Sequence, residues 1–235
     1  MSKYFDPSKI PGLMSTVMKA FPTTIELVVF SVFFSLLLGI LFVTLALSGN
    51  RIPKGIYGVY IAFMRGMPTL ILIFILYFVA PIYLKKAGIS TDSWSKNVFI
   101  IATLSLSSGA AMGEMIRSAF LSVDRIQWDA AYSIGMGRLA AFRRVIFPQM
   151  FGVAIPTLGN NIVSIFKSTS LAFSIGAVDI FGQAKLISGR LYGLNRAELY
   201  IGVALIYWVI CLILEQVTKW AEKLYTKGRV GQVVS

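Results

Sequence analysis

Five long apolar stretches, separated by segments that hold most of the charges, divide the chain. They cover about residues 21–47, 56–84, 97–120, 145–166 and 199–214. A helix that crosses the roughly 30 Å hydrocarbon core of a bilayer needs about 20 largely apolar residues, because each residue advances about 1.5 Å. Each stretch is therefore a candidate membrane span. The pattern predicts an all-α integral membrane protein with about five transmembrane helices.

The regions that flank the spans are short. Residues 1–20 form an N-terminal arm, residues 21–225 a single transmembrane domain, and residues 226–235 a C-terminal tail. The arm lacks the compact apolar core and small-residue cleavage site of a secretory signal, so we expect the first span to remain in the mature protein. We see no internal repeat and no insertion the size of a soluble domain.

Composition supports the membrane class and narrows the chemistry. Hydrophobic residues make up 57% of the 235 positions and charged residues only 14%, which is too little polar surface for a water-soluble domain. The formal charge of +12 would suggest nucleic acid in a soluble protein. Here the basic residues border apolar runs, so an anionic lipid surface explains them and no nucleic-acid partner is predicted.

The chain also lacks the usual groups of enzymatic and metal chemistry. It contains no histidine, and its single cysteine, Cys211, lies inside an apolar run. The commonest acid–base group and metal ligand is therefore missing, and an internal disulfide is excluded. We predict a protein with no catalytic residues and no metal site of its own.

Charge gives a weak prediction of orientation. Eleven Lys and Arg residues follow the first, third and fifth spans, against nine on the opposite side. Five of the eleven lie at or after the end of the third span: Arg117, Arg125, Arg138, Arg143 and Arg144. The positive-inside rule then places the segment between the third and fourth spans in the cytoplasm.

That segment, residues 122–148, is long and patterned for a connector between spans. Trp128, Ala131, Tyr132 and Gly135 recur at spacings of three and four, which indicates one face of a helix. A Gly-Met-Gly sequence that starts at Gly135 then offers a break before a second helical period. Two short helices joined by a glycine elbow are predicted.

The same segment resembles the EAA loop of ABC importer permeases. The resemblance rests on Asp129, Ala130, Ala131, Gly135, Ile146 and Pro148. Residues 65–69, 105–117, 156–160 and 167–171 are similar to blocks of the polar amino acid uptake branch of these permeases, the last of them most like cystine-type members. The resemblance covers about residues 20–220.

The resemblance implies a fold, a mechanism and a set of partners. It implies a permease fold like that of the methionine importer, in a prokaryotic cell membrane. The EAA loop would act as a coupling helix that docks on a cytoplasmic ATP-binding subunit, through the six residues named above. Asp129 stands where the family usually has Glu, which keeps the charge and shortens the reach by one methylene. The other implied partners are a second permease subunit, identical or paralogous, and an extracellular solute-binding protein.

ATP and Mg²⁺ would be bound by the partner, because the chain has no Gly-x-x-x-x-Gly-Lys-Ser/Thr phosphate loop. The competing interpretation of the loop is an amphipathic helix on lipid headgroups, with Arg138, Arg143 and Arg144 facing anionic lipid. The competing function classes are an autonomous ion-coupled carrier or channel and a scaffold that moves nothing.

Polar side chains at membrane depth are costly, so each is a candidate for the transport pathway or for a structural pair. The candidates for substrate binding are Ser107, Glu114, Asn160, Asn161, Ser164, Lys167 and Ser168. For Glu114, the alternative is a structural pair with Arg117 or Arg65. For the fourth-span residues, the alternative is hydrogen bonding between helices, with Lys167 reaching outward to the interface.

Three further expectations concern the third and fourth spans. Ser105, Gly109 and Gly113 form a stripe of small residues that predicts close helix packing. Pro156 and Gly159 can bend or open the fourth span. A direct pair between Lys167 and Glu114 would require such a break, because Lys167 lies about 28 Å along the helix from Pro148.

The resemblance also bears on the cargo. In relatives that move cationic amino acids, acidic residues often stand near the positions of Asn161 and Ser168. Their absence here favours a neutral or zwitterionic amino acid, with cystine as a candidate.

Overall fold

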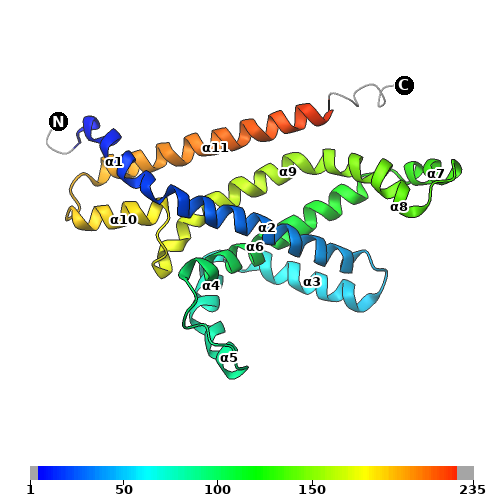
Figure 1. The fold of residues 1–235 in the computed structure, drawn as a ribbon, viewed down its shortest axis with the longest axis horizontal. Coiled ribbons are helices and arrows are strands. Elements are labelled where there is room, and N and C mark those ends of the chain that lie inside the picture. Colours follow the sequence, from blue (N-terminus) through cyan, green and yellow to red (C-terminus); the bar gives the residue numbers. More distant parts are fainter. Residues whose placement is uncertain (1–4, 227–235) are drawn as a thin grey trace.

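The computed structural model describes residues 5–226, and every regular element within this range is helical. Four long helices form the body: α2 (Phe21–Ala46), α6 (Lys96–Leu121), α9 (Phe147–Ser168) and α11 (Arg196–Thr226). They run roughly along the longest axis of the molecule (Figure 1). The strongest contact joins α2 to α6, and α9 packs against both α6 and α11.

Length and composition give four to five candidate spans in this range. Four are Pro7–Ala46, Thr69–Lys86, Lys96–Leu121 and Arg196–Tyr225, and the bent pair Arg138–Ile175 and Ile180–Arg190 supplies a fifth. The predictions of an all-α membrane protein and of about five spans are confirmed.

The N-terminal arm is helical from Pro7 onward. Helices η1 (Pro7–Lys9), α1 (Ile10–Val17) and η2 (Met18–Ala20) lead directly into α2. Val17 is buried against residues of α10 and α11, so this part of the arm belongs to the bundle. The predicted C-terminal tail, residues 226–235, lies outside the described residues except for Thr226, where α11 ends.

The second span begins later than the predicted residues 56–84, because the helix is broken at Met67 and Pro68. Helix α3 (Arg51–Gly66) ends before Met67 and Pro68, and α4 (Thr69–Phe74) begins after them. Met67 is extended, with φ −99° and ψ 127°, because the ring of a following proline disfavours the helical conformation. The candidate span is therefore Thr69–Lys86, completed by η3 (Ile75–Val79) and α5 (Ala80–Lys86). Helix α3 lies outside this candidate span and packs on α2 and α6.

Two helical runs contain a wider π turn just before a proline. In η3, the amide of Ala80 donates to the carbonyl of Ile75, ahead of Pro81. In η4 (Phe142–Ile146), the amide of Phe147 donates to the carbonyl of Phe142, ahead of Pro148. A proline ring clashes with the carbonyl four residues earlier, and a π turn relieves that clash without ending the helix. The run from α8 (Arg138–Ala141) into α9 is thus one continuous rod.

The close packing predicted for the third span is confirmed in α6. Ser105, Gly109 and Gly113 are all buried. A Cβ placed on Gly39 of α2 would lie 2.9 Å from the backbone nitrogen of Gly113 and 2.9 Å from Cβ of Met112. The two backbones therefore approach as closely as glycine permits.

The fourth span does not open at Pro156 and Gly159, because α9 remains continuous through both. The bend, 43°, falls later, between η5 (Thr169–Ile175) and α10 (Ile180–Arg190). Gly176 adopts φ +76° at this bend. Helix α10 was not predicted, because its own residues do not form a long apolar run.

Candidate functional site

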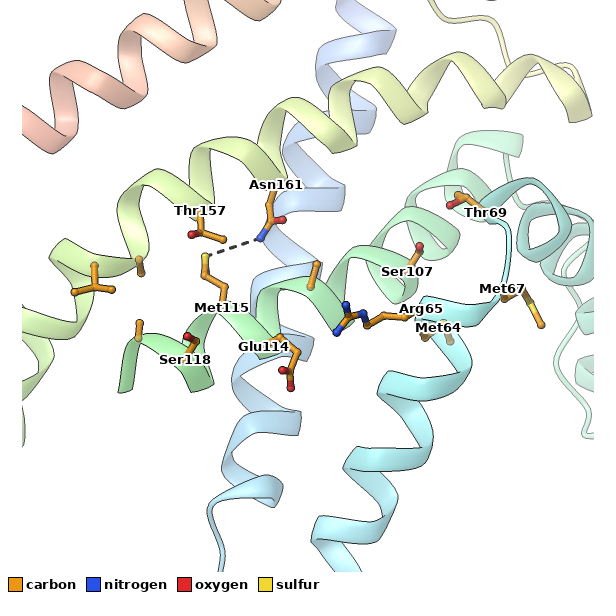
Figure 2. A pocket seen from close by; sticks show the side chains of 14 residues that line it. Met64, Arg65, Met67, Thr69, Ser107, Glu114, Met115, Ser118, Thr157 and Asn161 are labelled. Atoms are coloured by element: carbon orange, nitrogen blue, oxygen red, sulfur yellow. Dashed lines mark hydrogen bonds between the residues drawn. The ribbon is translucent and has the colours of Figure 1, made fainter. Parts of the chain in front are cut away.

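A cavity of about 610 Å³ lies between α3, α6 and α9. Its polar lining includes three residues predicted from the sequence, Ser107, Glu114 and Asn161, which come from two different helices. Arg65 and Thr157 join them (Figure 2). The tertiary structure thus brings a carboxylate, a guanidinium, an amide and several hydroxyls to one cavity.

Glu114 is held by two neighbours on one of its carboxylate oxygens. The Tyr57 hydroxyl of α3 donates a hydrogen bond to Oε1 of Glu114, and Nε of Arg117 lies 3.3 Å from the same oxygen. The structural pair with Arg117 that the sequence offered as an alternative is present. Arg65 lies close enough to interact electrostatically with Glu114. Within residues 5–226, Oε2 of Glu114 has no hydrogen bond, so the carboxylate can still accept one from a ligand.

The side-chain amide of Asn161 donates to weak hydrogen-bond acceptors. Nδ2 lies 3.6 Å from the sulfur of Met112 and 3.9 Å from that of Met115, the second of which Figure 2 shows. Thioether sulfur is a weak acceptor, so most of the hydrogen-bonding capacity of this amide is unused. Thr157, one turn earlier on α9, is exposed to the same cavity. A ligand with polar ends would satisfy both groups.

The other predicted substrate residues lie elsewhere. Asn160 and Lys167 line a separate groove of about 450 Å³ between α9 and α11. Ser164 is exposed, Ser168 is half-buried, and neither lines the cavity or the groove. Consecutive helical residues point about 100° apart, so Asn160 and Asn161 face different hollows. Glu114 and Lys167 do not pair, as expected for an unbroken α9.

Sequence reasoning did not assign Arg65 and Thr157 to a ligand cavity. The spacing of four between Thr157 and Asn161 was a usable signal, because such residues share a helix face. For Arg65, the sequence offered only a possible pair with Glu114. Its position depends on how α3 packs against α6, which a linear pattern does not reveal.

The loop between α6 and α9 contains the predicted first helix and elbow. Helix α7 (Arg125–Ser133) is capped at its N-terminus by Asp124, whose side chain accepts a hydrogen bond from the amide of Ile126 at 2.9 Å. The chain reverses at Gly135, which adopts φ +80°, and its amide donates to the carbonyl of Tyr132 at 2.9 Å. This left-handed termination confirms the first short helix and the glycine elbow, but the second segment is not a separate short helix, because α8 continues through η4 into α9. Figure 1 shows them beyond the ends of α6 and α9, at the opposite end of the molecule from α1 and α10.

The six loop residues divide into an outer and an inner group. Asp129, Ala130 and Gly135 are exposed. Ala131 and Ile146 are 3% and 0% exposed, so they pack inside the chain and are not available to a partner's surface. Pro148 is half-buried at the start of α9.

Aromatic packing fixes α7 to the membrane helices. Trp128 lies between Phe120 at the end of α6 and Phe142 of η4, with ring centroids 6.3 and 6.4 Å away. Nε2 of Gln149 also donates to Oε1 of Gln127 at 3.3 Å. These contacts join the loop to the end of α6 and to the helical run that leads into α9.

A buried polar junction at the far end of the bundle escaped sequence reasoning. Asp179, which is 0% exposed, accepts the amide of Gly182 at 2.8 Å and thereby caps α10. The hydroxyls of Tyr207 and Thr169 donate to its other oxygen at 3.0 and 3.4 Å. One carboxylate thus joins η5, α10 and α11. An Asp directly before the first helical residue was the available signal.

We expect Asp179→Ala to destabilise the protein, because it removes the α10 cap and leaves the Tyr207 hydroxyl without its acceptor. A loss of about 2 kcal/mol corresponds to a drop of about 5 °C in the unfolding midpoint. Asp179→Asn, which can still cap, should lose less. The exposed Asp92→Ala is the control, and the measurement is thermal unfolding in detergent. Equal midpoints for Asp179→Ala and the control would contradict the junction's role.

Within residues 5–226, no group of three His, Cys, Asp or Glu side chains is placed to hold a metal ion. A helical membrane bundle with a polar cavity between its spans and a firmly packed elbow loop at one end is the architecture of a transport permease. Residues 31–227 match the family described as binding-protein-dependent transport system inner membrane component. The chain belongs to this family of ABC importer permeases, which are multi-pass proteins of the prokaryotic cell membrane.

Two similar proteins are named as amino-acid permeases. The chain is 34% identical over 230 residues to the L-cystine transport system permease protein TcyL of Bacillus subtilis, covering 97% of this chain and 95% of that protein. It is 35% identical over 227 residues to the probable amino-acid ABC transporter permease protein PatM of Vibrio harveyi, covering 96% and 99%.

Solved structures agree on the fold. A crystal structure of an amino acid ABC transporter with histidines superposes with a TM-score of 0.79 at 26% identity, covering 93% of this chain and 98% of that one. An inward-facing MetNI methionine transporter superposes with a TM-score of 0.70 at 16% identity, covering 92% and 98%. The predicted resemblance to the methionine-importer fold is confirmed.

Proposed function

We propose that this chain is the membrane-spanning permease subunit of an ATP-driven importer for polar amino acids, with a neutral or zwitterionic cargo and cystine as the first candidate. The cavity between α3, α6 and α9 is the observation that carries the proposal. It presents the Glu114 carboxylate, the Arg65 guanidinium and the Asn161 amide to one space. An α-ammonium and an α-carboxylate are the complementary ends of an amino acid. The identity to TcyL supports cystine.

The energy for transport comes from ATP hydrolysis by a partner subunit. A separate ATP-binding subunit binds ATP and Mg²⁺. It contacts the loop from the cytoplasm at Asp129, Ala130 and Gly135. The continuous rod from Arg138 to Ser168 supports this route, because Asn161 lies on the same rod that carries the loop. A second permease subunit completes the pathway, and an extracellular solute-binding protein delivers the cargo.

The test of function is uptake of labelled cystine by liposomes that contain the whole assembly. We expect uptake only when the ATP-binding subunit, ATP and the solute-binding protein are all present. Uptake by this chain alone, driven by an ion gradient, would contradict the importer class. Stronger competition by unlabelled arginine or histidine than by cystine would contradict the cargo assignment.

A variant in the same assay tests the cavity. Asn161→Leu should raise the half-saturating cargo concentration of the assembly by about tenfold to a hundredfold, because a polar site that loses one hydrogen-bonding group loses about 1–3 kcal/mol. Ser164→Ala, on the same helix but outside the cavity, is the matched control. If both variants behaved like the wild type, the cargo would not bind at Asn161.

A further inference from the structure

The carboxylate of Glu114 is held by a side chain that lies outside the cavity lining. The Tyr57 hydroxyl donates a hydrogen bond to Oε1 of Glu114, yet Tyr57 is not among the residues that line the cavity. Among residues 51–66 of α3, only Tyr57 is buried, with 7% of its surface exposed. A buried hydroxyl in this position can influence a bound ligand only through the carboxylate that it contacts.

The ring of Tyr57 is fixed by close packing on α6. A Cβ on Gly113 would lie 3.7 Å from Cε2 of Tyr57, so the ring rests against α6 where a glycine leaves room for it. Arg117, the other donor to Oε1 of Glu114, has a side chain that is 39% exposed. A buried aromatic ring has fewer torsions to order than an exposed arginine side chain. Tyr57 is therefore the more rigid of the two donors.

The two donors leave one oxygen of the carboxylate open. Tyr57 and Arg117 both donate to Oε1, and within residues 5–226 Oε2 of Glu114 accepts no hydrogen bond. The Glu114 side chain is 31% exposed and lines the cavity. A side chain that is already held in place loses less conformational entropy when a ligand binds. The carboxylate can thus accept a hydrogen bond from a ligand without first being ordered.

The cavity offers a different group to each end of an amino acid. Arg65 is suited to the α-carboxylate, and Glu114 to the α-ammonium. We propose that Tyr57 is a positioning residue for cargo recognition: its hydroxyl fixes the Glu114 carboxylate for the α-ammonium group, which makes the site selective for α-amino acids over carboxylic acids that lack the amine. This inference rests on the proposed function, which places an amino acid in this cavity.

Direct binding to the purified complex of the full chain with its ATP-binding subunit tests this role. The solute-binding protein is left out, because its own selectivity would hide that of the cavity. The probes are labelled cystine and dithiodipropionate, an analogue that lacks both ammonium groups and keeps the carboxylates and the disulfide. Tyr57→Phe removes only the hydroxyl. It should raise the Kd for cystine by about tenfold and leave the Kd for dithiodipropionate within about twofold, because only cystine uses the fixed carboxylate.

Two further variants separate positioning from a structural role. Tyr60, on the next turn of α3, donates to the carbonyl of Leu106 at 2.7 Å. Tyr60→Phe therefore removes a comparable hydroxyl that does not contact Glu114, and it should leave the ratio of the two Kd values unchanged. Glu114→Gln should weaken cystine binding by itself. Adding Tyr57→Phe to Glu114→Gln should then change the Kd for cystine by less than about twofold, because the two residues act as one unit.

A selective loss of cystine binding in Tyr57→Phe that disappears in the Glu114→Gln background supports the inference. Equal weakening of both probes, no weakening, or an undiminished effect in that background would overturn it, as would a wild-type complex that does not distinguish the probes. Uptake of labelled cystine by the whole assembly is measured in parallel. A wild type without ATP-driven uptake contradicts the proposed function, whereas normal uptake with an unselective Tyr57→Phe contradicts only the role of Tyr57.

Discussion

Replacing Gly135 with valine is expected to abolish ATP-driven uptake and stimulation of the ATP-binding subunit together. Gly135 adopts φ +80°, a conformation that is strongly unfavourable for a β-branched residue. Nothing lies within 4 Å of a Cβ at this position, so the cost arises from the backbone and not from a clash. The elbow would relax toward a right-handed conformation at a cost of at least about 1–2 kcal/mol, and α7 would be displaced from α8.

The neighbouring glycine provides a control for this experiment. Gly137 has φ −69° and equally open surroundings, so Gly137→Val adds bulk without the left-handed strain. Gly135→Asn should be intermediate, because asparagine tolerates the left-handed region. Uptake and ATP hydrolysis are measured on the same preparations. Wild-type coupling in Gly135→Val would show that the elbow does not transmit movement. Loss of uptake with normal stimulation of ATP hydrolysis would place the defect in the cargo pathway.

Replacing Gly39 with leucine is expected to cause the largest loss of stability. The new Cβ would lie 2.9 Å from the backbone nitrogen of Gly113, and backbone cannot move aside as a flexible side chain can. Helices α2 and α6 would have to separate along the main contact of the bundle. Overpacking of this kind costs about 3 kcal/mol, equivalent to a fall of about 10 °C in the unfolding midpoint.

The controls for Gly39 separate packing from helix propensity. Gly58→Leu on α3 places the same side chain in open space, and it should be neutral or stabilising because leucine favours helix over glycine. Met112→Ala should not rescue Gly39→Leu, since the contact with the backbone of Gly113 remains. A wild-type midpoint for Gly39→Leu would mean that α2 and α6 pack less closely than described.

The elbow loop shows how far local pattern alone can reach. Helix α7 and the reversal at Gly135 were predictable, because a left-handed turn needs glycine and the helix termination is decided within a few residues. The burial of Ala131 was not predictable from that pattern. Ala131 lies three residues after Trp128, which packs between Phe120 and Phe142 from elements on both sides of the loop.

The sequence by itself determined the membrane class, the number of spans, the small-residue packing of α6 and the family, because hydropathy, residue size and motif order are written along the chain. Only the tertiary structure decided that Asn161 and Asn160 face different hollows. It alone brought Arg65 to the cavity and Asp179 to its buried junction. These outcomes depend on which helices pack together and at what angle. Such contacts join residues that are far apart in the chain, and a local sequence pattern does not reveal them.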